Sequence, residues 1–472
     1  MSWDEFISRQ NGLYSVRYIL DKNPALLTYY DRYYGTAFEN LLVLIEKALR
    51  YTDPQSVFYM RHLVTFLVFY LSTIALYLLL KLNTANRAIS LIGALFLILS
   101  PRIFADSFYN SKDLVFMSVS IIALYTLTKF HHQPRLKSAL IHALTSAFLT
   151  DIRIVGIVII PLTILFNLKN IKLLLIYLLS SSMLTIVFWP ILWHNPPLEL
   201  FTALKSMANF TPWQGQVLYM GKFITSTALP WHYLPVWIGI TTPLSLLILG
   251  LVGTFISLRK LLTANCQLPT TLPLLWFYTP LLYVILRHPI LYDGWRHFYF
   301  IYPAWIMLCV TTLKYIFSLK NKFIKVFSLS LIGLDLLIVG IFMIRNHPYQ
   351  NVYFNFLTGN MAKTKLNFEL DYWGLSLTEG YRYIAEHDPS PVIRIFAPLA
   401  PGETSIATLP ASDRKRLIID TKNPTGAKYL ISNYRWHPKP FPFPISPIFE
   451  KNISDVPIVS VFDISQISIV AN

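Results

Sequence analysis

Long apolar runs separated by short polar connections dominate this sequence as far as about residue 345. The hydrocarbon core of a bilayer is roughly 30 Å thick, and a helix of about 20 apolar residues crosses it. Only 14% of the 472 residues are charged, whereas a soluble domain has about 25%. The sequence therefore predicts a polytopic α-helical membrane protein of about ten spans, at 62–80, 88–101, 114–128, 138–151, 153–168, 173–193, 234–257, 272–286, 298–316 and 324–344.

Lys and Arg residues fall in every second connection, and they set the expected direction of the spans. Cytoplasmic loops of membrane proteins carry an excess of these residues. The cytoplasmic connections are therefore those containing Lys81/Arg87, Lys129/Arg135/Lys137, Lys169/Lys172, Arg259/Lys260 and Lys314/Lys320/Lys322/Lys325. The same rule explains the formal net charge of +16, so no nucleic-acid partner is expected. We expect a multi-pass protein of a bacterial inner membrane or an equivalent membrane.

The stretch 138–168 is apolar except for Asp151 and Arg153 near its centre. Both of its ends are basic and are placed in the cytoplasm, so it must cross the membrane twice. A charged pair left in the middle of the bilayer would be costly. We therefore expect a hairpin of two short helices, with Asp151, Ile152 and Arg153 at its outer tip.

Three regions follow from this topology: an outer first loop at 1–57, a transmembrane core at 58–345 and a small extracytoplasmic domain at 346–472. In the first loop, residues 37–50 place apolar side chains on one helical face, opposite charged ones such as Glu39 and Glu46. This pattern predicts an amphipathic helix on the membrane surface. No apolar run precedes the first loop. Either a short tail is translocated, or a further helix precedes Met1, and we favour the second.

Residues 346–472 alternate β-rich runs with one helical segment and proline-rich turns, which predicts a mixed α/β domain. The expected helix lies near Ser376–His387. The expected strands are Val392–Phe396, Arg416–Ile419, Tyr429–Ser432 and Val456–Phe462.

Carboxylates, basic side chains and aromatic rings concentrate in the outer loops. Such a mixture suits an anionic, sugar-bearing substrate, because carboxylates activate hydroxyls, Arg and Lys neutralise phosphate, and rings stack on sugars. Simpler explanations also exist: Arg102 could extend to the membrane interface, and Asp106 and Asp113 could pair locally with Lys112. The sequence contains no nucleotide-binding glycine motif, no zinc-type spacing and no serine-hydrolase elbow.

These loops resemble the GT-C superfamily of integral-membrane glycosyltransferases over nearly the whole chain. The branch they resemble contains the dolichyl-phosphate-mannose protein mannosyltransferases and the aminoarabinose transferases, the family-39-like glycosyltransferases. The residues that carry the resemblance are Asp4-Glu5, Pro101 to Asp113, Asp151 to Gly156, Pro230 to Pro235, Tyr292 to His297 and His347 to Asn355.

The resemblance implies transfer of a hexose or pentose from a polyprenyl- or dolichyl-phosphate donor to a glycan, lipid or protein acceptor at the outer or lumenal face. It implies an acidic base in the first outer loop, which is best matched by Asp4 with Glu5 beside it. Attack in line with the departing phosphate would invert the anomeric centre.

Basic side chains near the leaving phosphate would stabilise its developing charge. The candidates are Arg102, Lys112, Arg153, Arg296 and His297. Asp106 and Asp113 resemble a second acidic position that helps some relatives to bind a divalent cation. The sequence does not decide whether Mg²⁺ or Mn²⁺ is bound.

The main alternative function is a polytopic transporter or lipid flippase. That function predicts ionisable residues at mid-span and interrupted helices in related halves of the chain. Asp335 is the notable charged residue inside an expected span. A non-catalytic scaffold and a glycan polymerase or ligase that uses a lipid-pyrophosphate donor are further alternatives.

Overall fold

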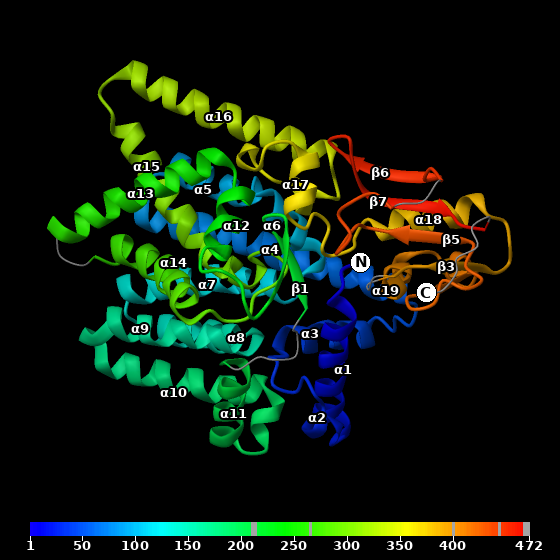
Figure 1. Cartoon of the computed structure of the whole chain (residues 1–472). Helices are drawn as coiled ribbons and strands as arrows, with labels where there is room; N and C mark the ends of the chain where they lie inside the picture. The colour runs from blue at the N-terminus through cyan, green and yellow to red at the C-terminus, as the bar shows by residue number, and fades with distance from the viewer. Residues whose placement is uncertain (209–214, 264–266, 399–401, 442–444, 466–472) are drawn as a thin grey trace.

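The structure is a computed structural model that describes residues 1–208, 215–263, 267–398, 402–441 and 445–465 (Figure 1). Within these residues, seven helical stretches are long and apolar enough to cross a membrane, or eight if one bent pair counts as a single span. The seven are α4 (Pro54–Thr84), α7 (Asp113–His132), Ile154–Phe188, α13 (Leu244–Thr263), α14 (Leu268–Arg287), Arg296–Ser318 and α16 (Lys322–Arg345). The stretch Ile154–Phe188 contains η1 (Ile154–Val158), α9 (Ile159–Asn167), η2 (Leu168–Asn170) and α10 (Ile171–Phe188), and Arg296–Ser318 contains η4 (Arg296–Ile301) and α15 (Tyr302–Ser318). The shorter helices beside them are α5 (Arg87–Ile98), α6 (Pro101–Tyr109), α8 (Leu136–Ile152) and α12 (Tyr233–Thr241).

The expected count of ten spans is not confirmed. The expected span 138–151 is α8, which has 17 residues and is not among the seven, and the expected spans 153–168 and 173–193 fall in the single stretch Ile154–Phe188. Two other expected spans are each divided into two helices. The 88–101 run ends as α5, and the chain bends by 66° into α6. The 234–257 run is split between α12 and α13. Both breaks precede a proline, which holds the residue before it in an extended conformation. Ser100 (φ −98°, ψ 99°) and Thr242 (φ −92°, ψ 138°) are these residues.

The predicted hairpin of two short helices is confirmed. Helices α8 and α9 lie antiparallel, because His142 Nε2 lies 2.8 Å from Thr163 Oγ1 and the two helices join at the residues after Ile152. The tip holds Asp151 and Arg153, but these two side chains do not pair. Asp151 Oδ1 instead accepts a hydrogen bond from the backbone N–H of Thr36 at 3.2 Å.

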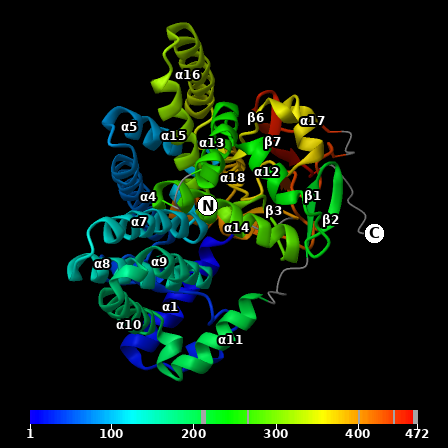
Figure 2. The same cartoon turned by 90° about the vertical axis from the view of Figure 1, so that its left-hand side faces the viewer.

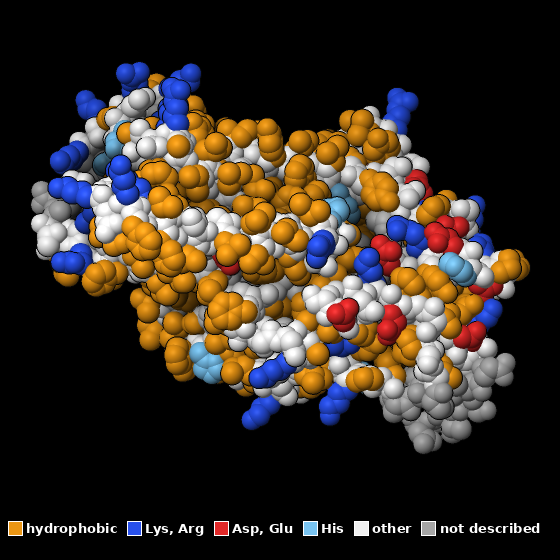
Figure 3. Space-filling view, turned by 90° about the horizontal axis from the view of Figure 1, so that it is seen from above, with side chains coloured by type: hydrophobic (Ala, Val, Ile, Leu, Met, Phe, Trp, Pro, Cys, Tyr) orange, Lys and Arg blue, Asp and Glu red, His pale blue; other side chains and the backbone are white. Residues whose placement is uncertain are grey.

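Hydrophobic side chains form a broad band over the helices, and Lys and Arg gather at the end of this band away from the C-terminal sheet (Figure 3). That end holds the C-termini of α4, α7, α13 and α15. Helix α16 lies at the edge of the bundle and is mostly exposed (Figure 2). The basic connections expected on one side therefore lie together in space.

The N-terminal region forms α1 (Glu5–Asp21), α2 (Ala25–Thr28) and α3 (Ala37–Ala48). Helix α3 is the predicted amphipathic helix, but the expected exposure of its charged face is wrong. Glu39 and Glu46 are buried and pair with arginines of α4 and α1, whereas Leu41 and Leu44 are exposed. The acidic face packs on the protein because these arginines neutralise it, so the leucines are left to face the surroundings.

The C-terminal sheet has five strands in the order β4-β3-β5-β7-β6. Its bounds are β3 (Ile393–Phe396), β4 (Leu417–Asp420), β5 (Tyr429–Ser432), β6 (Phe449–Ile453) and β7 (Val456–Asp463). β4 and β5 are parallel to β3, and β7 is antiparallel to β5 and β6. Four strands and the covering helix α18 (Leu377–His387) match the prediction, whereas β6 was not predicted.

The remaining elements are α11 (Pro196–Ala208), β1 (Gln216–Tyr219), β2 (Lys222–Thr225), η3 (Pro190–Trp193), η5 (Gln350–Val352), η6 (Phe356–Thr358), α17 (Met361–Asn367), α19 (Gly402–Ser405), η7 (Ile406–Thr408) and α20 (Ala411–Arg414).

The segment leading to this sheet is fastened to the membrane core. The Asn355 amide donates to the carbonyls of Gly239 and Thr242 at 2.7 and 2.8 Å, which satisfies acceptors at the end of α12. Trp373 packs edge-on against Tyr109 of α6. The sheet domain therefore rests on the outer ends of α6 and α12.

Candidate active site

A cavity of about 400 Å³ lies where η1, α11, α14 and the start of η4 meet the loop before α7. One part of its lining is charged and comes from Asp4, Lys112, Arg153, Arg296 and His297. The other part is apolar and includes Ile157, Val158, Leu204, Met207 and Phe298. The cavity therefore offers an ionic end beside an apolar channel.

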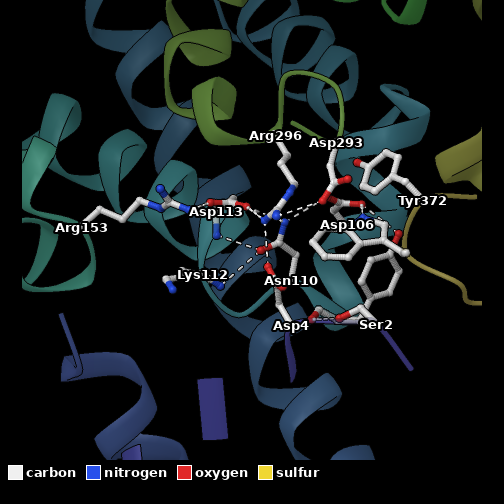
Figure 4. Close-up of polar contacts among 12 residues, drawn as sticks. Ser2, Asp4, Asp106, Asn110, Lys112, Asp113, Arg153, Asp293, Arg296 and Tyr372 are labelled. Carbon is white, nitrogen blue, oxygen red and sulfur yellow. Dashed lines mark hydrogen bonds and ion pairs between the residues drawn. The ribbon is translucent and has the colours of Figure 1, made fainter. Parts of the chain in front are cut away.

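Arg296 is the centre of the charged end (Figure 4). Its Nη1 donates to Asp4 Oδ2 at 3.0 Å and to Asp113 Oδ2 at 2.7 Å, and its Nη2 donates to Asp293 Oδ2 at 3.1 Å. The Trp373 ring lies 4.7 Å from the guanidinium carbon. Only 2% of the side chain is exposed. A charge buried this deeply needs such partners, because desolvation alone would be strongly unfavourable.

The backbone before Arg296 makes this arrangement possible. Asp293 and Gly294 both have positive φ values, 55° and 71°. Glycine adopts this region freely, and aspartate is among the few other residues that tolerate it. The resulting turn directs the Asp293 carboxylate back toward the first residue of η4.

Asp113 is the first residue of α7, and its side chain links the start of this helix to the tip of the hairpin formed by α8 and α9. Its Oδ1 contacts Arg153 Nη2, while its Oδ2 accepts from Arg296. The Asn110 side chain positions this end of α7, since its Oδ1 accepts from the Asp113 backbone N–H at 2.8 Å. Two predicted cationic residues and one predicted acidic residue are therefore brought together.

Lys112 enters the same cavity from the loop before α7. Its Nζ lies 3.3 Å from the centre of the Tyr34 ring, an arrangement in which the ring stabilises the cation. Burial and the nearby Arg153 lower the pKa of Lys112 to about 8. The loop that carries Tyr34 approaches closely because the next residue is Gly35, where a Cβ would lie 1.5 Å from the carbonyl oxygen of Asp151.

Asp4 and Glu5 diverge at the start of α1. The Asp4 side chain lines the cavity with 30% of its surface exposed, and within the described residues no donor bonds its Oδ1. Glu5 is turned into the protein, where Oε1 lies 2.5 Å from His62 Nε2 and Oε2 accepts from the Ser2 backbone N–H. The structure therefore brings only the first of the two candidate bases to the cavity.

Arg102 and Asp106 do not line the cavity, contrary to their expected places in the site. Arg102 Nε donates to the Tyr353 carbonyl at 3.1 Å, and its guanidinium lies on the Phe354 ring. Asp106 is fully buried and accepts from Tyr109, Asn110 and Trp373. Both face inward from α6 because the bend after α5 turns that helix across the core, and both fasten the C-terminal segment.

The acidic side chains do not fit a resident divalent cation in this arrangement. Among the residues that the structure describes, no group of three or more His, Cys, Asp and Glu side chains could hold a metal ion. The carboxylates of Asp4, Asp113 and Asp293 all point at Arg296, and Asp106 already accepts from three donors. A hard cation needs several free oxygens, and of these four carboxylates only Asp4 keeps an oxygen without a donor among the described residues.

No known protein family and no curated protein match this sequence. Among solved structures, the crystal structure of the apo oligosaccharyltransferase of Archaeoglobus fulgidus is similar, with a TM-score of 0.51 and 12% identity over 90% of this chain and 65% of that one. The chain therefore shares the fold of this archaeal protein. The same archaeal protein in complex with zinc and sulfate gives a TM-score of 0.49 at 12% identity, over 85% of this chain and 59% of that one. The chain thus spans about 65% of the length of the apo structure, and at this identity the likeness concerns the fold alone.

Within this fold, Asp335 has a structural explanation. Its Oδ2 accepts from the backbone N–H of Ser245 at 2.9 Å, in the first turn of α13. The unpaired N–H groups at the start of a helix need such acceptors, especially inside a membrane. Asp335 is absent from the lining of the cavity, so the feature that favoured a transporter has another role.

Sequence reasoning missed two side chains that complete the charged end. Asp293 belongs to the motif from Tyr292 to His297 but was assigned no role, although the Asp293-Gly294 pair is a turn signal. Arg435 gave no local signal, yet its Nη2 donates to Asp293 Oδ1 at 2.7 Å. Contacts between distant segments of this kind leave no pattern in the sequence.

Proposed function

We propose that this chain is an integral-membrane glycosyltransferase that moves a sugar from a polyprenyl-phosphate donor to a glycan, lipid or protein acceptor. The observation that carries the proposal is the cavity with one ionic and one apolar end. Lys112 and Arg153 would bind the phosphate, with His297 as a further donor. The lipid chain would follow the apolar side chains of η1, α11 and η4.

Asp4 would act as the general base. Its free carboxylate oxygen faces the cavity and could take the proton of an acceptor hydroxyl or amine as that atom attacks the anomeric carbon. The C–O bond to the lipid phosphate would break on the opposite side, so the configuration would invert. Lys112 and Arg153 would stabilise the charge on the departing phosphate. Arg296 is saturated by carboxylates, and its role would be to hold Asp4 and Asp113 in place.

The donor would carry a single phosphate and a single sugar, as in the mannosyltransferase and aminoarabinose transferase branch that the sequence resembles. A cavity of about 400 Å³ suits a sugar phosphate with the first part of its lipid. A lipid-pyrophosphate oligosaccharide is the competing donor class. The site would face the extracytoplasmic side, because the basic connections lie at the opposite end of the bundle (Figure 3).

The test uses purified protein in lipid vesicles with labelled polyprenyl-phosphate sugars and measures release of free polyprenyl phosphate. Asp4→Asn should lower release by about 10²- to 10⁴-fold, the usual contribution of a general base. Asp21→Asn, an exposed position at the end of the same helix, is the matched control and should behave as wild type. Equal release by wild type and Asp4→Asn, or release from no donor in the panel, would refute the proposal.

A further inference from the structure

The C-terminal domain contributes a charged side chain to the charged centre, Arg435, from the loop after β5. Its Nη2 donates to Asp293 Oδ1 at 2.7 Å. The other oxygen of Asp293 accepts from Arg296, which in turn holds Asp4 and Asp113. A line of alternating charges therefore runs from the C-terminal domain to the proposed base.

The loop around Arg435 is built to hold this side chain. Tyr434 and Trp436, on either side of it, both have a φ of 60°. Bulky residues adopt this left-handed region only where the surrounding structure enforces it, and such positions cluster at functional sites. The segment is therefore constrained at the residues that aim the arginine.

The Arg435 guanidinium is surrounded by neighbours, among them Glu369, whose Oε1 lies 3.9 Å from Arg435 Nε. It lies 5.0 Å from the Trp3 ring and 4.8 Å from the Trp436 ring, and its Nη1 donates to the Tyr372 carbonyl at 2.7 Å. Only 3% of the side chain is exposed, and Arg435 does not line the cavity. Its effect on transfer therefore passes through the side chains that it contacts, and of these Asp293 is the one that binds Arg296.

Charge balance explains what that effect would be. Arg153, Arg296 and Arg435 together face four carboxylates, those of Asp4, Asp113, Asp293 and Glu369 (Figure 4 shows all of these except Arg435 and Glu369). Without Arg435, Asp293 has only Arg296 as a cationic partner. Removal of one partner of a buried ion pair leaves an uncompensated charge and is strongly destabilising. The contacts of Asp293 with Arg296, and of Arg296 with Asp4, would then lose their fixed geometry.

We propose that Arg435 is a positioning residue that fixes Asp293, and through it Arg296 and the base Asp4, so that transfer requires the docked C-terminal domain. This inference rests on the proposed glycosyl transfer and extends it to a domain that does not line the cavity. A residue that acts in this way lowers the rate of the bound complex and leaves donor binding intact.

Arg414 provides a matched control for simple domain docking. It also belongs to the C-terminal domain and pairs across the same boundary, with Asp53 at the start of α4. It lies outside the cavity lining and outside the line of charges. If Arg435 served only to fasten the domain, Arg414→Ala and Arg435→Ala would have similar effects.

The experiment measures kcat and donor KM for wild type, Arg435→Ala, Arg435→Lys and Arg414→Ala in lipid vesicles. Arg435→Ala should lower kcat by about 10- to 100-fold, as expected when a catalytic group is displaced by about 1 Å, and should change KM by less than about threefold. Arg435→Lys keeps the charge but not the planar fork, so it should be intermediate. Arg414→Ala should keep the wild-type kcat. Equal losses in the two alanine variants, or a loss confined to KM, would overturn the proposal.

A second measurement does not depend on activity. Hydrogen–deuterium exchange of residues 288–301 should be faster in Arg435→Ala than in wild type and unchanged in Arg414→Ala. If wild type transfers no sugar from any donor, the proposed function fails, while this comparison still decides whether Arg435 orders the segment of Asp293 and Arg296. Unchanged exchange in Arg435→Ala would overturn the positioning role even in an active enzyme. Because Arg435→Lys keeps the buried charge, it serves for both measurements if the alanine variant fails to fold.

Discussion

Donor affinity should fall as Lys112 loses its proton. Burial and Arg153 lower the pKa of this lysine to about 8, so most of its charge disappears between about pH 7 and about pH 9. A hydrogen bond to a charged group is worth about 1.5–3 kcal/mol and a neutral one about 1 kcal/mol. The difference, about 0.5–2 kcal/mol, corresponds to a roughly 2- to 30-fold weaker donor affinity at the alkaline end.

The stability of the protein without donor should change in the opposite direction. The unfolded chain keeps Lys112 protonated up to its ordinary pKa of 10.5, whereas the folded chain releases the proton near 8. Between these values the unfolded state binds more protons, so the contribution of Lys112 to stability rises with pH. Below about pH 8 the buried charge keeps its full unfavourable effect.

The assay follows donor KM and the thermal midpoint from about pH 6.5 to about pH 9.5 for wild type and Lys112→Arg. Arginine stays charged over this range, so the variant should show a flat KM profile. The reasoning is refuted if the variant reproduces the wild-type rise in KM, or if wild-type affinity improves as pH increases.

Two other substitutions separate structure from chemistry. Although burial opposes it, the pairing with His62 lowers the pKa of Glu5, so its stabilising effect is present above pH 4.5 and is lost as the pH falls. Glu5→Gln should destabilise the protein at pH 7 by about 1–3 kcal/mol, measured in a thermal or denaturant melt. Its kcat should stay within a fewfold of the wild-type value. A kcat as low as that of Asp4→Asn would contradict a purely structural role for Glu5. Asp335→Ala should lower the melting temperature by uncapping α13, an effect of about 0.5–2 kcal/mol, while transfer in vesicles stays unchanged. Loss of transfer with an unchanged melting temperature would instead give Asp335 a direct functional role.

The sequence contained enough information for the parts of the fold that local patterns determine. The charges at 151–153 predicted the tip of the α8 hairpin, and alternating apolar residues predicted four of the five C-terminal strands. β6 was not predicted because Phe449–Ile453 contains three consecutive polar residues, Glu450, Lys451 and Asn452, and therefore lacks the apolar pattern of a strand. The span count was not confirmed because α8 is short, because two expected spans fall in the single stretch Ile154–Phe188, and because a bend before Pro101 shortens the run at 88–101.

The candidate site was predictable in its residue types and less so in its geometry. Asp4 and Glu5 are adjacent, yet the start of a helix turns one toward the cavity and the other into the core. Arg102 and Asp106 follow the same loop pattern as Lys112, but the 66° bend after α5 directs them inward. Local sequence patterns do not predict the orientation of these side chains, because it depends on how distant segments of the chain pack together.

The line of charges through Arg296 also bears on biosynthesis. Its members lie at positions 4, 113, 293, 296 and 435, so it closes only after nearly the whole chain has been made. Contacts between such distant positions form late, because each requires the closure of a long loop. A nascent chain that has inserted all its spans still lacks Arg435 until the C-terminal sheet folds. We expect such an intermediate to be inert toward lipid-linked sugars, which protects the donor pool while the protein is being assembled.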